Sequence, residues 1–217
     1  MKLKETSLRD EIVSLSRSLF DRGYSVGSSG NISALLPDGS VLMTPTNSCL
    51  GRLEARRISK LDQNGNHVSG DPPSKEAPLH LAFYKSRPGA GAVVHLHSTY
   101  ATALSCLQDL DPQDCLPPLT PYVVMRVGRV RLLPYVRPGD PAMFDMICAL
   151  RGTSAAVLLA NHGPVVAGHD LQAAVFAAEE LEETAKLAFV TGTLMRRQLT
   201  ESQIVELMKA FPPPEPG

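Results

Sequence analysis

Apolar positions recur along the chain at two spacings, one typical of helices and one typical of strands. Residues 6–22 place leucine, isoleucine and phenylalanine side chains at near-helical intervals, and Gly23 follows as a stop signal. Residues 30–47 hold two short apolar segments around the Pro-Asp-Gly sequence at 37–39, which is the turn chemistry of a β-hairpin. The pattern therefore predicts an amphipathic opening helix followed by a hairpin.

The rest of the chain alternates helical and strand-like patterns. Residues 72–89 predict a helix capped by Ser74, and residues 91–100 follow as a buried strand. The later predicted elements are a helix from Asp140 to about Leu150, a strand, turn and strand over 155–168, a long helix over 170–192, and a last helix opened by a capping box of Thr200 and Gln203. No repeat or linker divides the chain, so we expect one mixed α/β domain over residues 1–211 and a flexible Pro-rich tail over 212–217.

Composition narrows the class of partner. The 217 residues include 21 basic and 22 acidic side chains, and this near balance argues against wholesale binding of nucleic acid or membrane. No apolar run approaches the roughly 20 residues needed to cross a bilayer. The four cysteines are widely spaced without a Cys-x-x-Cys motif, and the N-terminus is too charged for a signal peptide. We expect a cytoplasmic protein with reduced thiols and a small-molecule partner.

The strand over residues 91–100, GAVVHLHSTY, contains two histidines separated by one leucine. Alternate side chains of a strand share a face, so His95 and His97 project together. Paired imidazoles suit a metal ion, because neutral ring nitrogens are common ligands. An isolated His-x-His more often marks two hydrogen-bonded histidines at a strand end, so further ligands are needed to favour a metal site.

Two other residues can complete a metal site. His162 follows a buried strand, and Glu76 lies in the first turn of the helix that precedes the histidine strand. Three imidazoles and one carboxylate satisfy a tetrahedral divalent ion, and displacement of the carboxylate opens a position for substrate. The other histidines, His67, His80 and His169, are expected to have surface or capping roles.

Two clusters of glycine and hydroxyl residues suggest an anion site. Residues 28–33, SSGNIS, and 44–47, TPTN, offer flexible N–H groups and short polar side chains. Ser74 and Lys75 add a hydroxyl, a positive charge and a helix N-terminus. Each cluster alone is compatible with an ordinary turn, but beside a metal site they favour a phosphorylated substrate.

Five motifs occur in order over nearly the whole chain: SSGNIS, TPTN, PSKE, HLH and NHG. This order resembles the class II aldolase/adducin family. Within that family the longer segments PPSKEAPLHLAFY, HLHSTYATALS, PPLTPYVVMRVGR and YVRPGDPA are most similar to the 3-oxo-tetronate 4-phosphate decarboxylases. The aldolases commonly have a second serine where this chain has Lys75 and a glycine where it has Asn47, which weakens the aldolase assignment.

The resemblance implies a single three-layer α/β/α domain, a homotetramer and a metal near a subunit boundary. It implies Zn²⁺, or alternatively Mn²⁺ or Co²⁺, on the four residues Glu76, His95, His97 and His162. It implies phosphate binding by Gly30, Asn31, Thr46, Asn47, Ser74 and Lys75.

The implied reaction is decarboxylation of a 3-oxo-tetronate 4-phosphate to dihydroxyacetone phosphate and carbon dioxide, through an enediolate that a divalent cation can chelate. Glu76 is expected to shuttle the proton, and Tyr122 is a candidate acid that reaches a neighbouring subunit's site. Lys75, Arg126 and Arg137 are candidates to hold the substrate's anionic groups. The alternatives are an aldolase or epimerase for another sugar phosphate and, from a different class, an adducin-like interaction module without catalysis.

Overall fold

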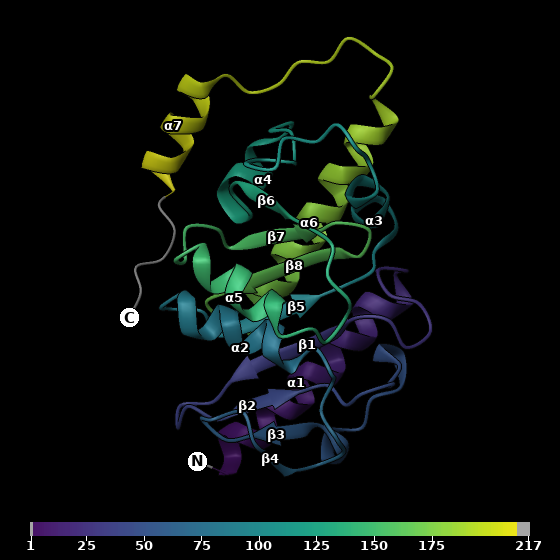
Figure 1. The fold of residues 1–217 in the computed structure, drawn as a ribbon, viewed down its shortest axis with the longest axis vertical. Coiled ribbons are helices and arrows are strands. Elements are labelled where there is room, and N and C mark those ends of the chain that lie inside the picture. Colours follow the sequence, from purple (N-terminus) through teal and green to yellow (C-terminus); the bar gives the residue numbers. More distant parts are fainter. Residues whose placement is uncertain (1, 212–217) are drawn as a thin grey trace.

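A computed structural model describes residues 2–211 of the chain, drawn as a ribbon in Figure 1. The helices are α1 (Lys2–Asp21), α2 (Ala77–Ser86), α3 (Thr99–Ser105), α4 (Pro121–Arg126), α5 (Ala142–Ala149), α6 (Leu171–Val190) and α7 (Glu201–Ala210), with two short 3₁₀ turns, η1 (Leu50–Arg52) and η2 (Ala55–Arg57). The strands are β1 (Asn31–Leu35), β2 (Val41–Met43), β3 (Ser59–Leu61), β4 (His67–Ser69), β5 (Ala92–His95), β6 (Val130–Leu133), β7 (Ala156–Leu159) and β8 (Gly163–Gly168).

The strands form one mixed sheet in the order β4-β3-β2-β1-β5-β8-β7-β6. Every neighbouring pair is antiparallel except β6 and β7, which run parallel. The strand β5 therefore lies at the centre, between β1 from the N-terminal hairpin and β8 from the second half of the chain. The residues at its end are buried between the two halves of the sheet.

Helices cover both faces of the sheet (Figure 1). Alternation along the strands sends Val94 and Leu158 to the face covered by α1 and α6. It sends Val93 and Val157 to the face covered by α2 and α5. Strands buried on both faces are apolar along their whole length, which explains the continuous apolar runs in the sequence. The predicted three-layer α/β/α domain is confirmed.

Most local signals act as predicted. The hairpin joins β1 to β2, and the Thr200–Gln203 capping box opens α7. One cap is different. The N-cap residue of α2 is Glu76, and the hydroxyl of Ser74 accepts a hydrogen bond from the N–H of Glu76 at 3.2 Å, so Ser74 orders the turn before the helix.

No helix within residues 2–211 is long and apolar enough to cross a bilayer. The predicted flexible tail, 212–217, lies outside the described residues.

Candidate metal centre and substrate pocket

The two histidines lie at the C-terminal end of the central strand and just beyond it. The strand β5 ends at His95, the next residue Leu96 is buried on the α1/α6 face, and His97 precedes α3. Both rings therefore point to the α2 side of the sheet. The first strand passes close by at Gly30, where a Cβ atom would lie 2.8 Å from the carbonyl oxygen of His95 and φ is +81°. Only glycine adopts this conformation in so little space without strain.

The third histidine comes from the turn between β7 and β8. His162 follows Asn161, whose φ of 56° is left-handed, and precedes Gly163. A Cβ atom on Gly163 would lie 2.5 Å from the carbonyl oxygen of Leu96. The missing side chain lets this turn approach the β5 backbone, and the close approach brings the His162 ring beside His95.

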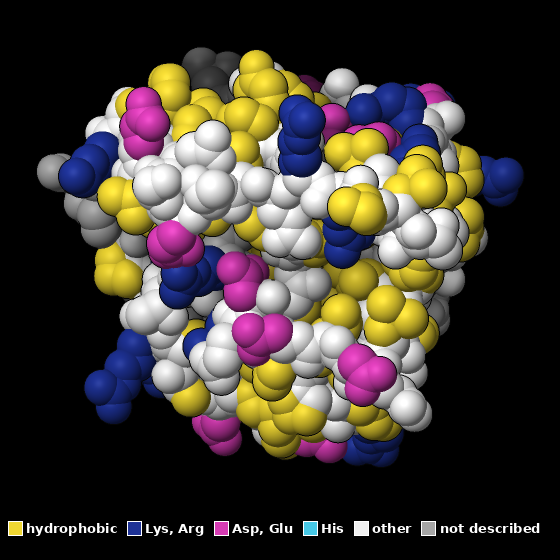
Figure 2. All heavy atoms as spheres, turned by 90° about the horizontal axis from the view of Figure 1, so that it is seen from above, with side chains coloured by type: hydrophobic (Ala, Val, Ile, Leu, Met, Phe, Trp, Pro, Cys, Tyr) yellow, Lys and Arg dark blue, Asp and Glu magenta, His cyan; other side chains and the backbone are white. Residues whose placement is uncertain are grey.

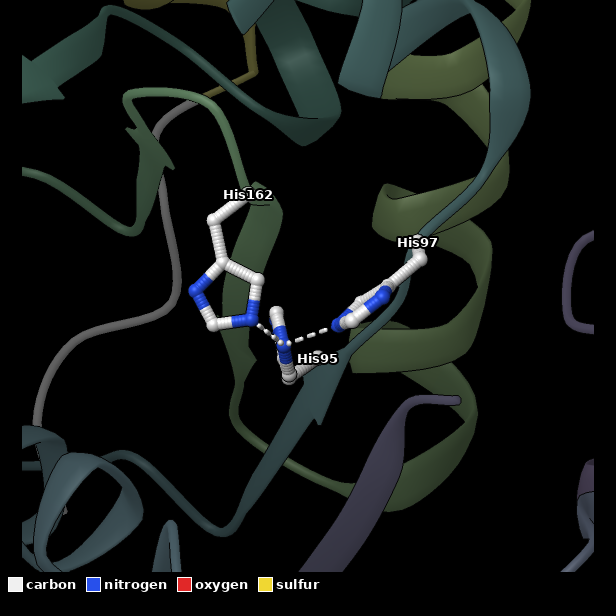
Figure 3. Close-up of side chains that lie close together, drawn as sticks. All are labelled: His95, His97 and His162. Atoms are coloured by element: carbon white, nitrogen blue, oxygen red, sulfur yellow. Dashed lines mark hydrogen bonds between the residues drawn. The ribbon is translucent and has the colours of Figure 1, made fainter. Parts of the chain in front are cut away.

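The three rings converge through one nitrogen each (Figure 3). His95 Nε2 lies 3.1 Å from His97 Nε2 and 3.3 Å from His162 Nε2. Their candidate ligand atoms all lie within 4.8 Å of one another. Two nitrogens bound at about 2.0–2.1 Å to one tetrahedral zinc ion are separated by roughly 3.3 Å, so the observed spacing fits such an ion.

The protonation states also fit a cation. His95 Nδ1 donates to the carbonyl oxygen of Pro164 at 2.9 Å, which leaves a lone pair on its Nε2. Burial lowers the pKa of His95, and burial together with the neighbouring His162 lowers that of His97. Burial likewise lowers the pKa of His162. Neutral rings with inward-facing nitrogens form an electron-rich cluster that a divalent ion stabilises.

Glu76 lies beside this cluster. Its Oε2 atom is 3.6 Å from His95 Nε2, and its Oε1 atom is 3.5 Å from His162 Nε2. Asn31 Nδ2 donates to Oε2 at 2.7 Å. Burial raises the pKa of Glu76, but the interactions with His95, Asn31 and His162 outweigh it, so the net pKa is lowered and the carboxyl group is ionised. A carboxylate and three imidazole nitrogens are a donor set that fits a divalent transition metal.

Two pockets adjoin the cluster, and Glu76 and His162 line both. The larger pocket, about 430 Å³ in volume, is polar, and its lining includes all six of the predicted phosphate residues: Gly30, Asn31, Thr46, Asn47, Ser74 and Lys75. The second pocket lies toward α2 and α5, and its lining combines apolar side chains such as Leu79 and Met143 with Arg137. The structure thus brings the predicted metal and phosphate residues together around one space.

Tyr122 is distant from this arrangement within one chain. It lies near the start of α4, is 54% exposed and lines neither pocket. Arg126, one turn further along α4, places its guanidinium 5.4 Å from the centre of the Tyr122 ring. The action of Tyr122 in a neighbouring subunit stays a prediction.

The expected surface or capping role of His80 is wrong. His80 is 1% exposed, and its ring contacts Asn31 and Ser33 of β1. His67 and His169 are on the surface as expected. A signal existed for His80, because Glu76, His80 and Tyr84 are spaced by four and so share one face of α2. Without the sheet in place, nothing showed which face of the helix would be buried.

Comparisons with known proteins agree with this geometry. The model of the Class II Aldolase and Adducin N-terminal domain matches residues 10–189. The chain is 55% identical over 203 residues, 94% of this chain and 96% of the other, to a 3-oxo-tetronate 4-phosphate decarboxylase of Escherichia coli. It is 36% identical, over 85% of this chain and 97% of the other, to an L-fuculose phosphate aldolase of Methanococcus maripaludis. The crystal structure of YgbL from Escherichia coli is similar with a TM-score of 0.92 and 54% identity, covering 94% of this chain and 98% of the other.

The ligand geometry predicts that the purified protein holds about one divalent ion per chain, with zinc preferred because three histidines favour it over magnesium. Elemental analysis measures this directly. His97→Ala should lose most of the metal while the circular dichroism spectrum stays unchanged, and His67→Ala, on the surface, is the matched control. Equal metal content in the two variants would contradict the assignment of His97 as a ligand.

Proposed function

The chain belongs to the class II aldolase and adducin family, and on that premise we propose that it decarboxylates a 3-oxo-tetronate 4-phosphate to dihydroxyacetone phosphate and carbon dioxide. The observation that carries the proposal is the 55% identity over 94% of the chain to a decarboxylase of that name, against 36% to an aldolase. The ligand cluster alone suits either reaction, because both pass through the same enediolate.

The residues that would hold the metal are Glu76, His95, His97 and His162, with zinc as the proposed ion and manganese or cobalt as alternatives. When bound, a divalent ion supplies a Lewis acid that stabilises negative charge developing on the substrate's oxygens. The chain's own contribution is to keep the imidazoles neutral, through burial and through the bond from His95 to Pro164.

The two pockets suggest how the substrate lies. The polar pocket offers Lys75, Ser74, Thr46 and the backbone near Gly30 to the phosphate. The carboxylate then points to the pocket of Leu79 and Met143, where Arg137 is the cation. An apolar wall around a carboxylate strips its hydration shell and favours departure of neutral carbon dioxide.

The chemistry then follows from bond breaking at C2. The bond from the carboxylate carbon to C2 breaks, and its electron pair moves into the C3 ketone to give an enediolate. A proton added to C2 gives dihydroxyacetone phosphate. Glu76 lines both pockets and so lies next to the bond that breaks. We assign it as the proton shuttle, because the ionised carboxylate can take a proton from solvent and deliver it to C2.

Tyr122 is proposed as an acid that completes the site of a neighbouring subunit in a homotetramer. Its exposure of 54% leaves it free to do so. Several large apolar side chains are also exposed near the end of α6, including Val190, Leu194 and Met195. Figure 2 views this end of the molecule and shows hydrophobic patches among charged side chains. Such patches are commonly buried by association.

The four free cysteines support a location in the cytoplasm.

The direct test is to incubate the metal-loaded protein with both epimers of 3-oxo-tetronate 4-phosphate and to assay carbon dioxide and dihydroxyacetone phosphate. One epimer should yield both products in equal amounts. Glu76→Gln should keep the fold but lower kcat by roughly a hundredfold or more, since a positioned acid is removed. Release of an aldehyde from a sugar phosphate, with no carbon dioxide from either epimer, would instead identify an aldolase.

A second test concerns the orientation of the substrate. Arg137→Gln should lower kcat/KM for decarboxylation by about tenfold or more, because a charge-assisted hydrogen bond to the carboxylate is lost. It should not change the rate at which the enzyme exchanges solvent deuterium into dihydroxyacetone phosphate, which has no carboxylate. Lys75→Gln is the control and should impair both reactions. Equal loss of both reactions in Arg137→Gln would contradict this orientation.

A third test mixes inactive chains. Tyr122→Phe and His97→Ala homo-oligomers should each be nearly inactive, because one lacks the acid and the other a metal ligand. Mixed oligomers can pair an intact metal centre with an intact tyrosine from the adjacent chain, so partial activity should return. Full activity of Tyr122→Phe alone, or no recovery once subunit exchange has been verified, would remove Tyr122 from the site.

A further inference from the structure

A chain of buried hydrogen bonds leads from the interior of the protein to the Glu76 carboxylate. His80 lies on α2 and contacts Asn31 and Ser33, two residues of β1 whose side chains point toward α2. Its Nδ1 atom is 2.7 Å from Ser33 Oγ, and its Nε2 atom is 2.5 Å from Asn31 Oδ1. Ser33 Oγ is also 2.7 Å from the hydroxyl of Tyr84, one turn further along α2.

The direction of each hydrogen bond follows from its end at Glu76. The ionised carboxylate only accepts, so the group of Asn31 that lies 2.7 Å from Oε2 must be its NH₂. The carbonyl oxygen of the Asn31 amide then faces His80, which must donate from Nε2. A neutral ring with its proton on Nε2 has a lone pair on Nδ1.

The same reasoning extends to the end of the hydrogen-bond network that is farthest from Glu76. Ser33 donates its hydroxyl proton to His80 Nδ1, and Ser33 Oγ accepts from Tyr84. Burial lowers the pKa of His80 to about 3, so the ring is neutral, as this assignment requires. All donors therefore point toward the carboxylate, and with Glu76 ionised and His80 neutral this assignment gives every buried group a partner.

We propose that His80 is a positioning residue for Glu76, acting through Asn31. The inference deepens the proposed function and rests on it for the role of Glu76. The terminal amide of an asparagine rotates easily, and its two orientations differ little in shape. Donation from His80 Nε2 holds the amide in the orientation that offers N–H to Oε2. Glu76 is thereby held next to His95 and His162.

Loss of the donor at His80 allows the Asn31 amide to turn its oxygen toward the carboxylate, which would displace Glu76 from the cluster. Of the six predicted phosphate residues only Asn31 belongs to this hydrogen-bond network, and Thr46, Ser74 and Lys75, which supply the hydroxyls and the positive charge, do not. The expected effect therefore falls on turnover and on metal retention, while substrate binding is largely kept.

Two substitutions of similar size separate the donor from the packing. Gln at position 80 has an N–H group that can lie near the place of Nε2, whereas Met fills a similar volume without a donor. His80→Met should lower kcat for decarboxylation by about tenfold or more, with KM changed less than about twofold. His80→Gln should retain kcat within about threefold of the wild type. Equal turnover of the two variants, both folded, would overturn the proposal.

Tyr84→Phe is the control, at the end of the hydrogen-bond network farthest from Glu76. It removes the first donor, but the hydroxyl of Ser33 can still donate to His80, so kcat should change by less than about twofold. Metal content and melting temperature are measured for all three variants. If Tyr84→Phe reduces kcat as strongly as His80→Met, then the general stability of the network matters and the donor to Asn31 does not.

A measurement on the wild-type protein keeps the proposal testable if a variant does not fold. Nitrogen-15 NMR of histidine-labelled protein reports which ring nitrogen carries the proton. His80 should be neutral, with the proton on Nε2 and a hydrogen-bonded lone pair on Nδ1. A proton on Nδ1 alone, or a charged ring at neutral pH, would overturn the assignment. This readout does not depend on activity, so it separates a failure of the inference from a failure of the proposed reaction.

Discussion

The antiparallel register between β1 and β5 places Asn31 directly opposite His95, and the site is built around this pair. Partners opposite each other in a sheet point to the same face, so the residue that contacts Glu76 and the central histidine share the α2 side. The same register places Ser33 opposite Val93, where it meets His80. A slip of one residue would turn these side chains to the other face, and the cluster would not form.

A second constraint is the balance of charge under the polar pocket. Glu76 is only 8% exposed, and an ionised carboxylate at such a position needs strong partners. It has one hydrogen bond, from Asn31, and the imidazoles around it are kept neutral by burial. The cluster therefore combines one negative charge with three neutral imidazoles, and the Nε2 atom of His95 carries a lone pair. A bound divalent cation would compensate the carboxylate charge and accept imidazole lone pairs, so this donor set fits such an ion.

The position of Glu76 and His162 between two pockets links the fold to the choice of reaction. In the proposed function, the polar pocket on one side and the apolar pocket with Arg137 on the other hold the two charged ends of the substrate. Cleavage of a carboxylate or of an aldehyde fragment needs the same enediolate stabilisation. Under the proposed function, the choice of reaction then depends on the lining of the pocket that holds the leaving group, rather than on the ligands.

Much of this protein was determined by local sequence. Apolar periodicity and turn residues predicted the opening helix, the hairpin at 37–39 and the capping box at Thr200, because these signals act within a few residues. The spacing of His95 and His97 and the ordered motifs named the candidate ligands and the family. Tertiary structure alone decided the rest. His80 lies 47 positions from Ser33 and 49 from Asn31 in the sequence. Only the packing of α2 on β1 removes the His80 ring from water and gives each of its two nitrogens a hydrogen-bond partner. Burial and hydrogen-bond direction depend on contacts distant in sequence, so no local pattern could specify them.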